Sequence, residues 1–272
     1  MLPANLPMDL KEKNILVVGG TSGLGESAAR MFLKCGARVV VTGRNPAKLD
    51  AAKNWLGDAG LAVACDASNP QQTEEAFQRL TQTFGALHGV YHVAGGSGRR
   101  FGDGPLHEIT DEGWDQTMHL NLDSVFYSNR AALRIFLEQG GGGAIVNCGS
   151  VLGFSPSPLF FTTHAYATAK SAMIGMTKSS AAHYARQGIR INLLCPGLVA
   201  TPMSERAQTN QSIMDFIRTK QPLDGGRIGL PDDLDGAAAF LLSDAARFVT
   251  GQVLSVDGGW SVSEGQGLNP DS

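Results

Sequence analysis

Residues 164–173, HAYATAKSAM, place a tyrosine and a lysine four positions apart among small residues. On a helix, Tyr166 and Lys170 would share one face, one turn apart. A phenol with a pKa near 10 is a poor base at neutral pH. A lysine charge about 4 Å away, at an effective dielectric of about 20, contributes roughly 4 kcal/mol and lowers that pKa toward neutrality. The spacing indicates an acid–base pair, although a surface tyrosine beside a solvated lysine also fits it.

Two further polar residues, Ser150 and Asn121, interrupt segments that are otherwise apolar. Ser150 ends the run AIVNCGS, which predicts a strand reaching the carboxyl edge of a sheet. Asn121 lies in TMHLNLDSVF, inside a long apolar helical segment, where a buried amide requires a polar partner. We therefore expect Asn121, Ser150, Tyr166 and Lys170 to converge.

A glycine-rich turn follows the first apolar run, in the sequence GGTSGLGESAARMF. Gly19, Gly23 and Gly25 suit a tight turn, a close approach to a pyrophosphate and a helix N-terminus aimed at its charge. After the second apolar run the chain has VTGRNP, with Arg44 and no carboxylate. This favours NADP(H), with NAD(H) still possible, because arginine accommodates a 2'-phosphate. Asp66 would accept from adenine or cap a turn.

Seven short apolar runs alternate with longer helical stretches. Continuous rather than alternating apolar residues are typical of parallel strands buried on both faces. We predict one doubly wound, Rossmann-type α/β domain over residues 1–272, with a seven-stranded parallel sheet flanked by helices and tails at 1–10 and 261–272. Asn45-Pro46 and Asn69-Pro70 predict helix starts. The strands are expected at residues 14–20, 37–43, 61–66, 89–95, 144–150, 189–197 and 252–259.

Composition argues against several other classes of protein. The net charge of -3 provides no basic field for nucleic acid or an anionic membrane. We find no apolar run long enough to span a bilayer and no signal peptide. The cysteines Cys35, Cys65, Cys148 and Cys195 are widely spaced, which favours reduced, packed thiols over a metal site. We therefore expect a cytoplasmic protein without a metal.

The pieces GGTSGLG, GSVLG, YATAK, RINLLCPGLVATPM and GQVLSVDGG stand in an order that resembles the short-chain dehydrogenase/reductase family over nearly the whole chain. The resemblance implies a catalytic tetrad of Asn121, Ser150, Tyr166 and Lys170. With the glycine-rich turn, it gives the expected cofactor-binding residues: Gly19, Thr21, Ser22, Gly23, Leu24, Gly25, Arg44, Asp66, Ala67, Ala94, Gly95, Tyr166, Lys170, Pro196, Gly197, Val199 and Thr201.

The chain departs from the family pattern in two places. The family usually has NNAG after strand four, whereas this chain has HVAG from His92 to Gly95, which bears on local stability. The loop between Ser150 and Tyr166 is also a few residues longer than usual, so Ser155, Ser157 and Thr163 are weaker alternatives to Ser150.

The resemblance implies an NAD(P)-dependent oxidoreductase acting on a small carbonyl or alcohol, such as a 3-oxoacyl-carrier or other ketone reductase. Tyr166 would be the general acid/base, Ser150 would hold the carbonyl oxygen and Asn121 would order a water. The alternatives are a non-catalytic nucleotide-binding regulator and an epimerase or dehydratase. Loops 97–110 and 203–226 are the expected substrate loops. Arg99 and Arg100 could attract an acidic substrate, although two solvated arginines are the favoured interpretation. Apolar residues in 111–138 and in the Tyr166 helix predict a homo-oligomer, a tetramer or dimer.

Overall fold

A computed structural model of the chain describes residues 8–265. Its sheet has seven parallel strands in the order β3-β2-β1-β4-β5-β6-β7. The strands are β1 (Asn14–Val18), β2 (Arg38–Gly43), β3 (Gly60–Ala64), β4 (Gly89–His92), β5 (Gly143–Cys148), β6 (Ile189–Pro196) and β7 (Val253–Val256). All seven predicted strands are present, which confirms the doubly wound fold.

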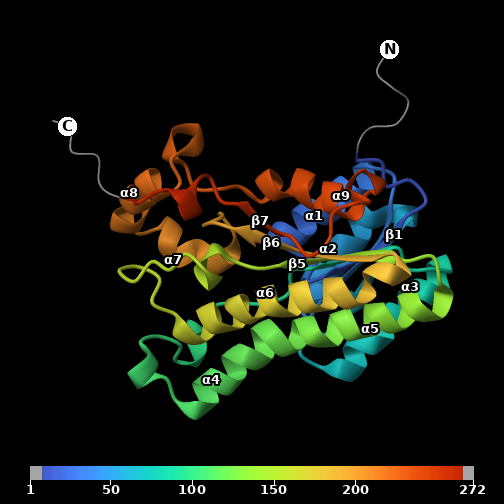
Figure 1. Cartoon of the computed structure of the whole chain (residues 1–272), viewed down its shortest axis with the longest axis horizontal. Coiled ribbons are helices and arrows are strands. Elements are labelled where there is room, and N and C mark those ends of the chain that lie inside the picture. The colour runs from blue at the N-terminus through green and yellow to red at the C-terminus, as the bar shows by residue number, and fades with distance from the viewer. Residues whose placement is uncertain (1–7, 266–272) are drawn as a thin grey trace.

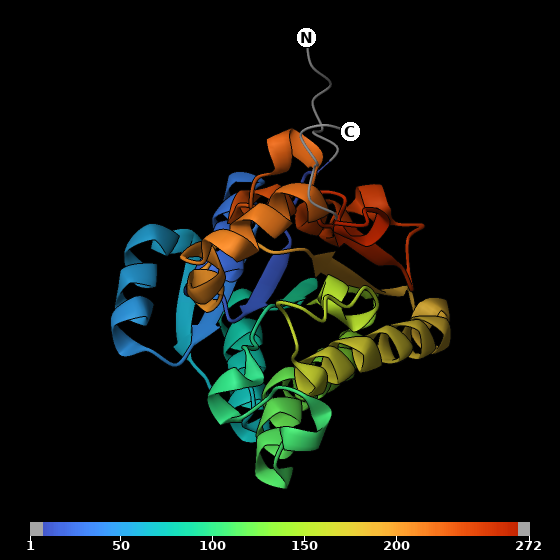
Figure 2. The same ribbon diagram turned by 90° about the vertical axis from the view of Figure 1, so that its left-hand side faces the viewer.

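Helices cover both faces of this sheet (Figures 1 and 2). The helices are α1 (Gly23–Lys34), α2 (Pro46–Leu56), α3 (Pro70–Phe84), α4 (Asp111–Met118), α5 (Ser124–Gln139), α6 (His164–Tyr184), α7 (Glu205–Gln208), α8 (Gln211–Lys220) and α9 (Asp235–Leu242). Ile15 and Val17 of β1 pack with α1, α2 and α9, whereas Leu16 and Val18 pack with α3, α5 and α6. Each strand therefore contributes to two cores, which explains its continuous apolar sequence.

The predicted helix starts at the two Asn-Pro pairs are confirmed. The Asn45 side chain accepts from the Lys48 N–H at 3.1 Å, and proline follows it at the first position of α2. The Asn69 side chain accepts from the N–H groups of Gln71 and Gln72 at the start of α3. Each asparagine satisfies amides that a helix start leaves unpaired.

The segment expected as one long helix around Asn121 is divided. A π-helical turn, His119–Asp123, separates α4 from α5. Such turns insert one extra residue into the helical path and are frequent at functional sites. Asn121 is the buried residue of this turn. The sequence indicated that the amide was exceptional but not that it interrupted the helix.

The expected tails lie mainly in residues 1–7 and 266–272, outside the described part of the chain. Within the described part, Leu10 is fully buried and donates its N–H to the Cys35 carbonyl oxygen at 2.9 Å. At the other end, a short 3₁₀ turn, Trp260–Val262, buries Trp260. These residues close the fold on the side of α1 and α8 respectively.

Candidate active site

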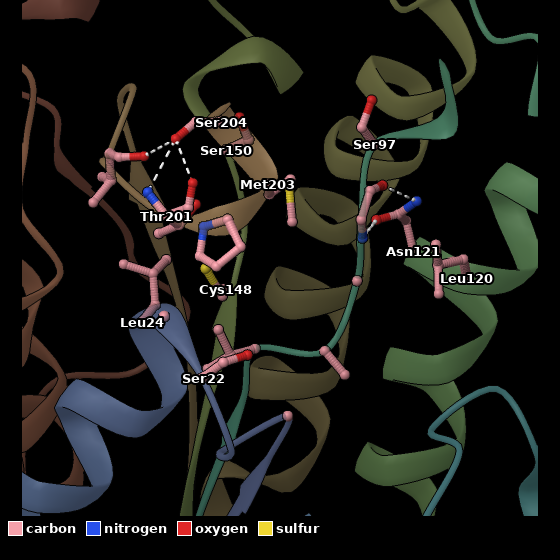
Figure 3. A pocket seen from close by; sticks show the side chains of 18 of the residues that line it. Ser22, Leu24, Ser97, Leu120, Asn121, Cys148, Ser150, Thr201, Met203 and Ser204 are labelled. Atoms are coloured by element: carbon pink, nitrogen blue, oxygen red, sulfur yellow. Dashed lines mark hydrogen bonds between the residues drawn. The ribbon is translucent and has the colours of Figure 1, made fainter. Parts of the chain in front are cut away.

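A cavity of about 1120 Å³ opens at the carboxyl edge of the sheet. It is lined by the turns that follow β1, β2, β4, β5 and β6, and by the first turns of α6. In Figure 3, Ser22 and Leu24 lie on one wall and Asn121 and Leu120 on the opposite wall, with Cys148 between them. The topology reverses beside β1, where β2 and β4 flank it, and ligands of such sheets bind at this position.

The tyrosine–lysine pair lies in this cavity, as the sequence predicted. Lys170 is 5% exposed, and its Nζ donates to the carbonyl oxygen of Cys148, the last residue of β5, at 2.8 Å. The ammonium also lies 5.6 Å from the centre of the Tyr166 ring. The helix α6 and the strand β5 therefore fix the lysine between the sheet and the phenol.

The expectation that the pKa of Tyr166 falls toward neutrality is wrong for this arrangement, because its net shift is upward. Burial is the largest cause acting on the phenol and raises its pKa well above the ordinary value, while a side-chain hydrogen bond with Ser150 opposes that shift. Burial also lowers the pKa of the Lys170 ammonium. The lysine charge is directed at a carbonyl oxygen, and Tyr166 is partly buried in the fold, so its pKa stays above the ordinary phenol value rather than falling toward neutrality.

Ser150, rather than Ser155 or Ser157, lies in the cavity with Tyr166. It lines the cavity, is 8% exposed and lies near enough to Tyr166 to oppose part of the rise in the pKa of that phenol. Its hydroxyl also accepts from the Leu152 N–H at 3.2 Å, which begins the 3₁₀ turn Val151–Gly153. Thr163 lines the cavity too, whereas Ser155 and Ser157 do not. The longer loop therefore leaves Ser150 in the expected place.

Asn121 closes the opposite wall through backbone contacts. Its Oδ1 accepts from the Gly96 N–H at 3.0 Å, and its Nδ2 donates to the carbonyl oxygens of Gly96 and Thr117, both at 3.0 Å. Both amide hydrogens are thus engaged, and only the second acceptor site of Oδ1 remains for a water. The residue holds the turn after β4 against the π-helical turn.

The glycine-rich turn forms a cradle that side chains would fill. Gly19 has a φ of 88°, and a Cβ there would meet the Ala94 nitrogen at 2.7 Å. A Cβ on Gly25 would collide with the Gly19 carbonyl oxygen. Ser22 precedes α1 without capping it through its side chain, so the first N–H groups of the helix remain available to an anion. This cradle fits the pyrophosphate of a dinucleotide.

Arg44 and Asp66, expected near the ribose and the adenine, are joined by an interaction that the sequence did not reveal. Arg44 Nη1 lies 3.5 Å from Asp66 Oδ2, and both residues line the cavity. Asp66 Oδ1 accepts from the Ser68 N–H and hydroxyl, so the turn-capping interpretation of Asp66 holds. These bonds outweigh the burial that opposes them and lower the pKa of Asp66. Arg44 is more than half exposed and remains open to a phosphate.

The segment after β6 forms the remaining wall. Gln221 Oε1 accepts from the Leu198 N–H at 2.5 Å, and Ser204 Oγ donates to the Val199 carbonyl oxygen at 2.6 Å and accepts from the Thr201 N–H at 3.0 Å (Figure 3). The structure places in the cavity every predicted site residue except Gly25, which supports the turn from behind: Gly19, Thr21, Ser22, Gly23, Leu24, Arg44, Asp66, Ala67, Ala94, Gly95, Asn121, Ser150, Tyr166, Lys170, Pro196, Gly197, Val199 and Thr201.

His92 occupies the place of the usual first asparagine and makes buried polar contacts there. Its Nδ1 lies 2.7 Å from Ser128 Oγ, and its Nε2 lies 3.0 Å from the Ala94 carbonyl oxygen. Burial, followed by the charge of Lys170, lowers the pKa of His92 to about 3. The imidazole is therefore neutral and ties the turn after β4 to α5, a structural role.

Two contributors to the site were not singled out from the sequence. Asp103, 4% exposed, accepts from the N–H groups of Ala165 and Tyr166 at the start of α6. Arg206 lines the cavity from α7. Nothing in the local pattern of GDGPL or SERAQ marks either residue, since each gains its partners only from a distant segment.

The described residues contain no group of three side chains suited to a metal ion, and none of their helices is long and apolar enough to cross a membrane. The four cysteines are free, and burial raises the pKa of the Cys195 thiol to about 12. Cys65, Cys148 and Cys195 are buried and Cys35 is partly buried, an arrangement that fits packed thiols.

A glycine cradle, a Ser–Tyr–Lys group in one cavity and a reversed sheet topology define a dinucleotide-dependent oxidoreductase of the Rossmann class. The family model described as enoyl-(acyl carrier protein) reductase matches residues 18–261. The chain belongs to the short-chain dehydrogenase/reductase family. It is therefore an NAD(P)-dependent enzyme acting on CH–OH or C=O groups.

Individual relatives show how far the likeness extends. The chain is 35% identical over 267 residues to 3beta-hydroxysteroid dehydrogenase 2 of Eggerthella lenta, covering 93% of this chain and 96% of that protein. It is 32% identical over 252 residues to the 3-oxoacyl-acyl-carrier-protein reductase FabG of Vibrio cholerae, covering 93% and 98%. A short-chain type dehydrogenase/reductase structure from Mycobacterium ulcerans matches with a TM-score of 0.85 at 33% identity, covering 93% and 91%. Relatives with different substrates share the same fold.

Proposed function

We propose that the protein reduces a ketone, or oxidises the corresponding secondary alcohol, with Tyr166 as the group that gives or takes the proton. The observation that carries this proposal is the convergence of Ser150, Tyr166 and Lys170 on a cavity that continues to the glycine cradle. A bound nicotinamide dinucleotide would supply or accept the hydride. The phenol stays protonated at neutral pH, which suits the donor in the direction of carbonyl reduction.

The other groups position the reacting oxygen. Ser150 and Tyr166 line the same cavity, so a carbonyl oxygen bound beside both hydroxyls would receive two donors. Lys170, held on the Cys148 carbonyl, keeps a positive charge beside the phenol, which stabilises the phenolate left after proton transfer. Asn121 keeps the wall beside Gly96 in place, and its remaining acceptor site is where an ordered water would donate.

The cofactor proposed is NADP(H), because strand β2 ends at an exposed arginine without a carboxylate. The residues proposed to hold it are those of the glycine cradle, Arg44, Asp66 and the segment after β6. We also propose a cytoplasmic homo-oligomer, a tetramer or dimer, built through α5 and α6. Exposed apolar residues on α5, Phe126 at 46% and Leu137 at 48%, support that surface.

A panel of ketones assayed for oxidation of NADPH and NADH tests this function. We expect turnover of at least one ketone class, with loss of turnover in Tyr166→Phe. Arg79→Gln is the matched control, because Arg79 lies on the exposed face of α3 and does not line the cavity. Chemistry in which the cofactor ends in its original redox state would instead identify an epimerase or dehydratase.

A further inference from the structure

Arg99 and Arg206 come from distant segments and meet at one backbone carbonyl beside the cavity. Arg99 lies in the loop after β4, and its Nη2 donates to the carbonyl oxygens of Phe160 and Thr162 at 3.5 and 3.3 Å. Arg206 lies in α7, and its Nη2 donates to the same Phe160 oxygen at 3.2 Å. In Figure 2, the yellow-green loop after β5 runs between the orange α7–α8 segment and the green segment before α4. Two guanidinium groups therefore flank one carbonyl.

The charges of this pair are not neutralised by the described residues. None of their ion pairs includes Arg99 or Arg206. Burial, followed by the charge of Arg206, lowers the pKa of Arg99. The charge of Asp103 acts in the opposite direction but does not cancel the shift. Asp103 already accepts from the N–H groups of Ala165 and Tyr166. Two like charges that are held close together and contact only neutral groups repel each other. An anion that binds between them lowers their electrostatic free energy.

The carbonyls that hold the two arginines belong to a loop fixed by aromatic packing. The Phe160 ring lies 5.1 Å from the Phe216 ring of α8, and the Phe161 ring lies 5.6 Å from Trp260. Phe160, Phe161 and Phe216 pack on a core cluster that includes buried Trp260. The arginines are thus anchored on a supported segment, which reduces the entropy lost when a ligand binds.

We propose that Arg99 and Arg206 form a subsite for an oxyanion of the substrate, a carboxylate, phosphate or sulfonate on the same molecule as the reacting carbonyl. Both arginines and Tyr166 line one cavity, so one ligand can reach both. A guanidinium has five N–H donors, and these contacts use only some of them, so each arginine retains donors for a forked contact with an oxyanion. The inference rests on the proposed function and adds the substrate class.

Kinetics with matched substrates test the subsite. Oxo acids of increasing chain length are compared with their methyl esters, which keep the ketone and remove the charge. We expect kcat/KM to favour the acid at a preferred length. Arg206→Gln and Arg99→Gln should lower kcat/KM for that acid roughly 10- to 100-fold, the span of a hydrogen bond to a charged group, and leave the ester unchanged.

The control Arg79→Gln removes the same charge from the exposed face of α3 and should leave the preference for the acid intact. Acids and esters turned over equally well at every length would overturn the subsite. So would arginine variants that lower acid and ester kcat/KM alike, because that result indicates a structural role.

A binding measurement separates the subsite from the proposed function. Succinate and its neutral diamide are titrated calorimetrically into the unmodified protein, Arg206→Gln and Arg44→Gln. Binding of succinate alone that is lost in Arg206→Gln and kept in Arg44→Gln supports the subsite, even if no ketone is reduced and the proposed function fails. Succinate binding that is absent, or that depends on Arg44 rather than Arg206, refutes it.

Discussion

Asp103 accepts a hydrogen bond from the backbone N–H of Tyr166 at 3.0 Å and a second from that of Ala165 at the same distance. A carboxylate from the loop after β4 therefore caps the helix that carries Tyr166 and Lys170. The positive end of a helix favours such a charge. The same loop carries Arg99, which lines the cavity, so one acidic side chain couples this loop to the position of the phenol.

Replacement of Asp103 should affect both stability and rate. Asp103→Ala leaves one buried and one partly buried N–H group without their acceptor, so we expect the free energy of unfolding to fall by about 1–3 kcal/mol. The first turn of α6, which carries Tyr166, should also shift. We therefore expect kcat to fall and KM to change less. Asp103→Asn keeps one acceptor oxygen and should recover part of both losses. Denaturant unfolding and steady-state kinetics measure the two effects, and an unchanged kcat in folded Asp103→Ala would refute the coupling.

His92 should make the protein sensitive to acid. Its pKa is about 3 in the fold and about 6.5 in the unfolded chain, so between these values the unfolded state binds the extra proton. Stability from the neutral imidazole is complete above about pH 6.5 and declines as pH falls toward 3. His92→Asn restores the family's usual residue and removes this titration. Its free energy of unfolding should fall less between pH 6.5 and about 4; equal declines in both proteins would contradict the assignment.

Much of the fold could be predicted because parallel strands buried on both faces have continuous apolar sequences. The runs over β1 and β5 illustrate this, since alternate residues fill two separate cores. The π-helical turn at Asn121 could not be predicted, because it depends on contacts between the amide and the Gly96 backbone, 25 residues away. The helix propensities of neighbouring residues carry no information about contacts between segments so far apart in the sequence.

The residues expected to bind cofactor or act in catalysis lie in one cavity, because their motifs stand at strand ends that the topology brings together, while their roles stay predictions. The pKa of Tyr166 was predicted in the wrong direction, because spacing gives the distance to Lys170 but not the burial of the phenol. Asp103 and Arg206 were missed for a related reason. A single charged residue in a loop has no pattern, and its role arises from the backbone groups it meets in the fold.

Arg44 should determine the choice of cofactor. We expect tighter binding of NADPH than NADH, because Arg44 is exposed at the end of β2 and no carboxylate stands there. Arg44→Asp would repel the 2'-phosphate and accept from a 2'-hydroxyl, shifting the ratio of dissociation constants roughly 10- to 100-fold toward NADH. Arg79→Asp is the distant charge control. Titration calorimetry measures the ratio, and NADH binding as tightly as NADPH to the unmodified protein would refute the assignment.

The exposed apolar face of α5 should lie in a subunit interface. Phe126 is 46% exposed and stacks with Arg130, whose guanidinium carbon lies 4.9 Å from its ring centre. We expect light scattering at micromolar concentration to give a mass of two or four chains, and Phe126→Asp to reduce it by placing a charge in an apolar contact. Leu106→Asp, at a residue 63% exposed in another segment, is the control. A monomeric unmodified protein would refute this assembly.

The raised pKa of Tyr166 predicts the pH dependence of turnover. Reduction requires the protonated phenol, so its rate at saturating substrate should be level through neutral pH and fall only above the ordinary phenol value of about 10. Oxidation requires the phenolate and should rise over the same alkaline range. Profiles measured in both directions test the sign. A reduction rate that falls already near neutrality would show that Tyr166 ionises there.

Tyr166 and Lys170 should behave as one unit in mutagenesis. Tyr166→Phe removes the proton donor and should lower the rate roughly 100- to 10,000-fold. Lys170→Ala should also be severe, because it removes the charge 5.6 Å from the phenol ring and the bond to the Cys148 carbonyl. If the lysine acts on the reaction through the phenol, the double variant should be little slower than Tyr166→Phe alone. The comparison is made at saturating cofactor, so that weaker cofactor binding does not enter. Losses that multiply there would mean that the two residues act independently and that Lys170 has a separate role in the reaction.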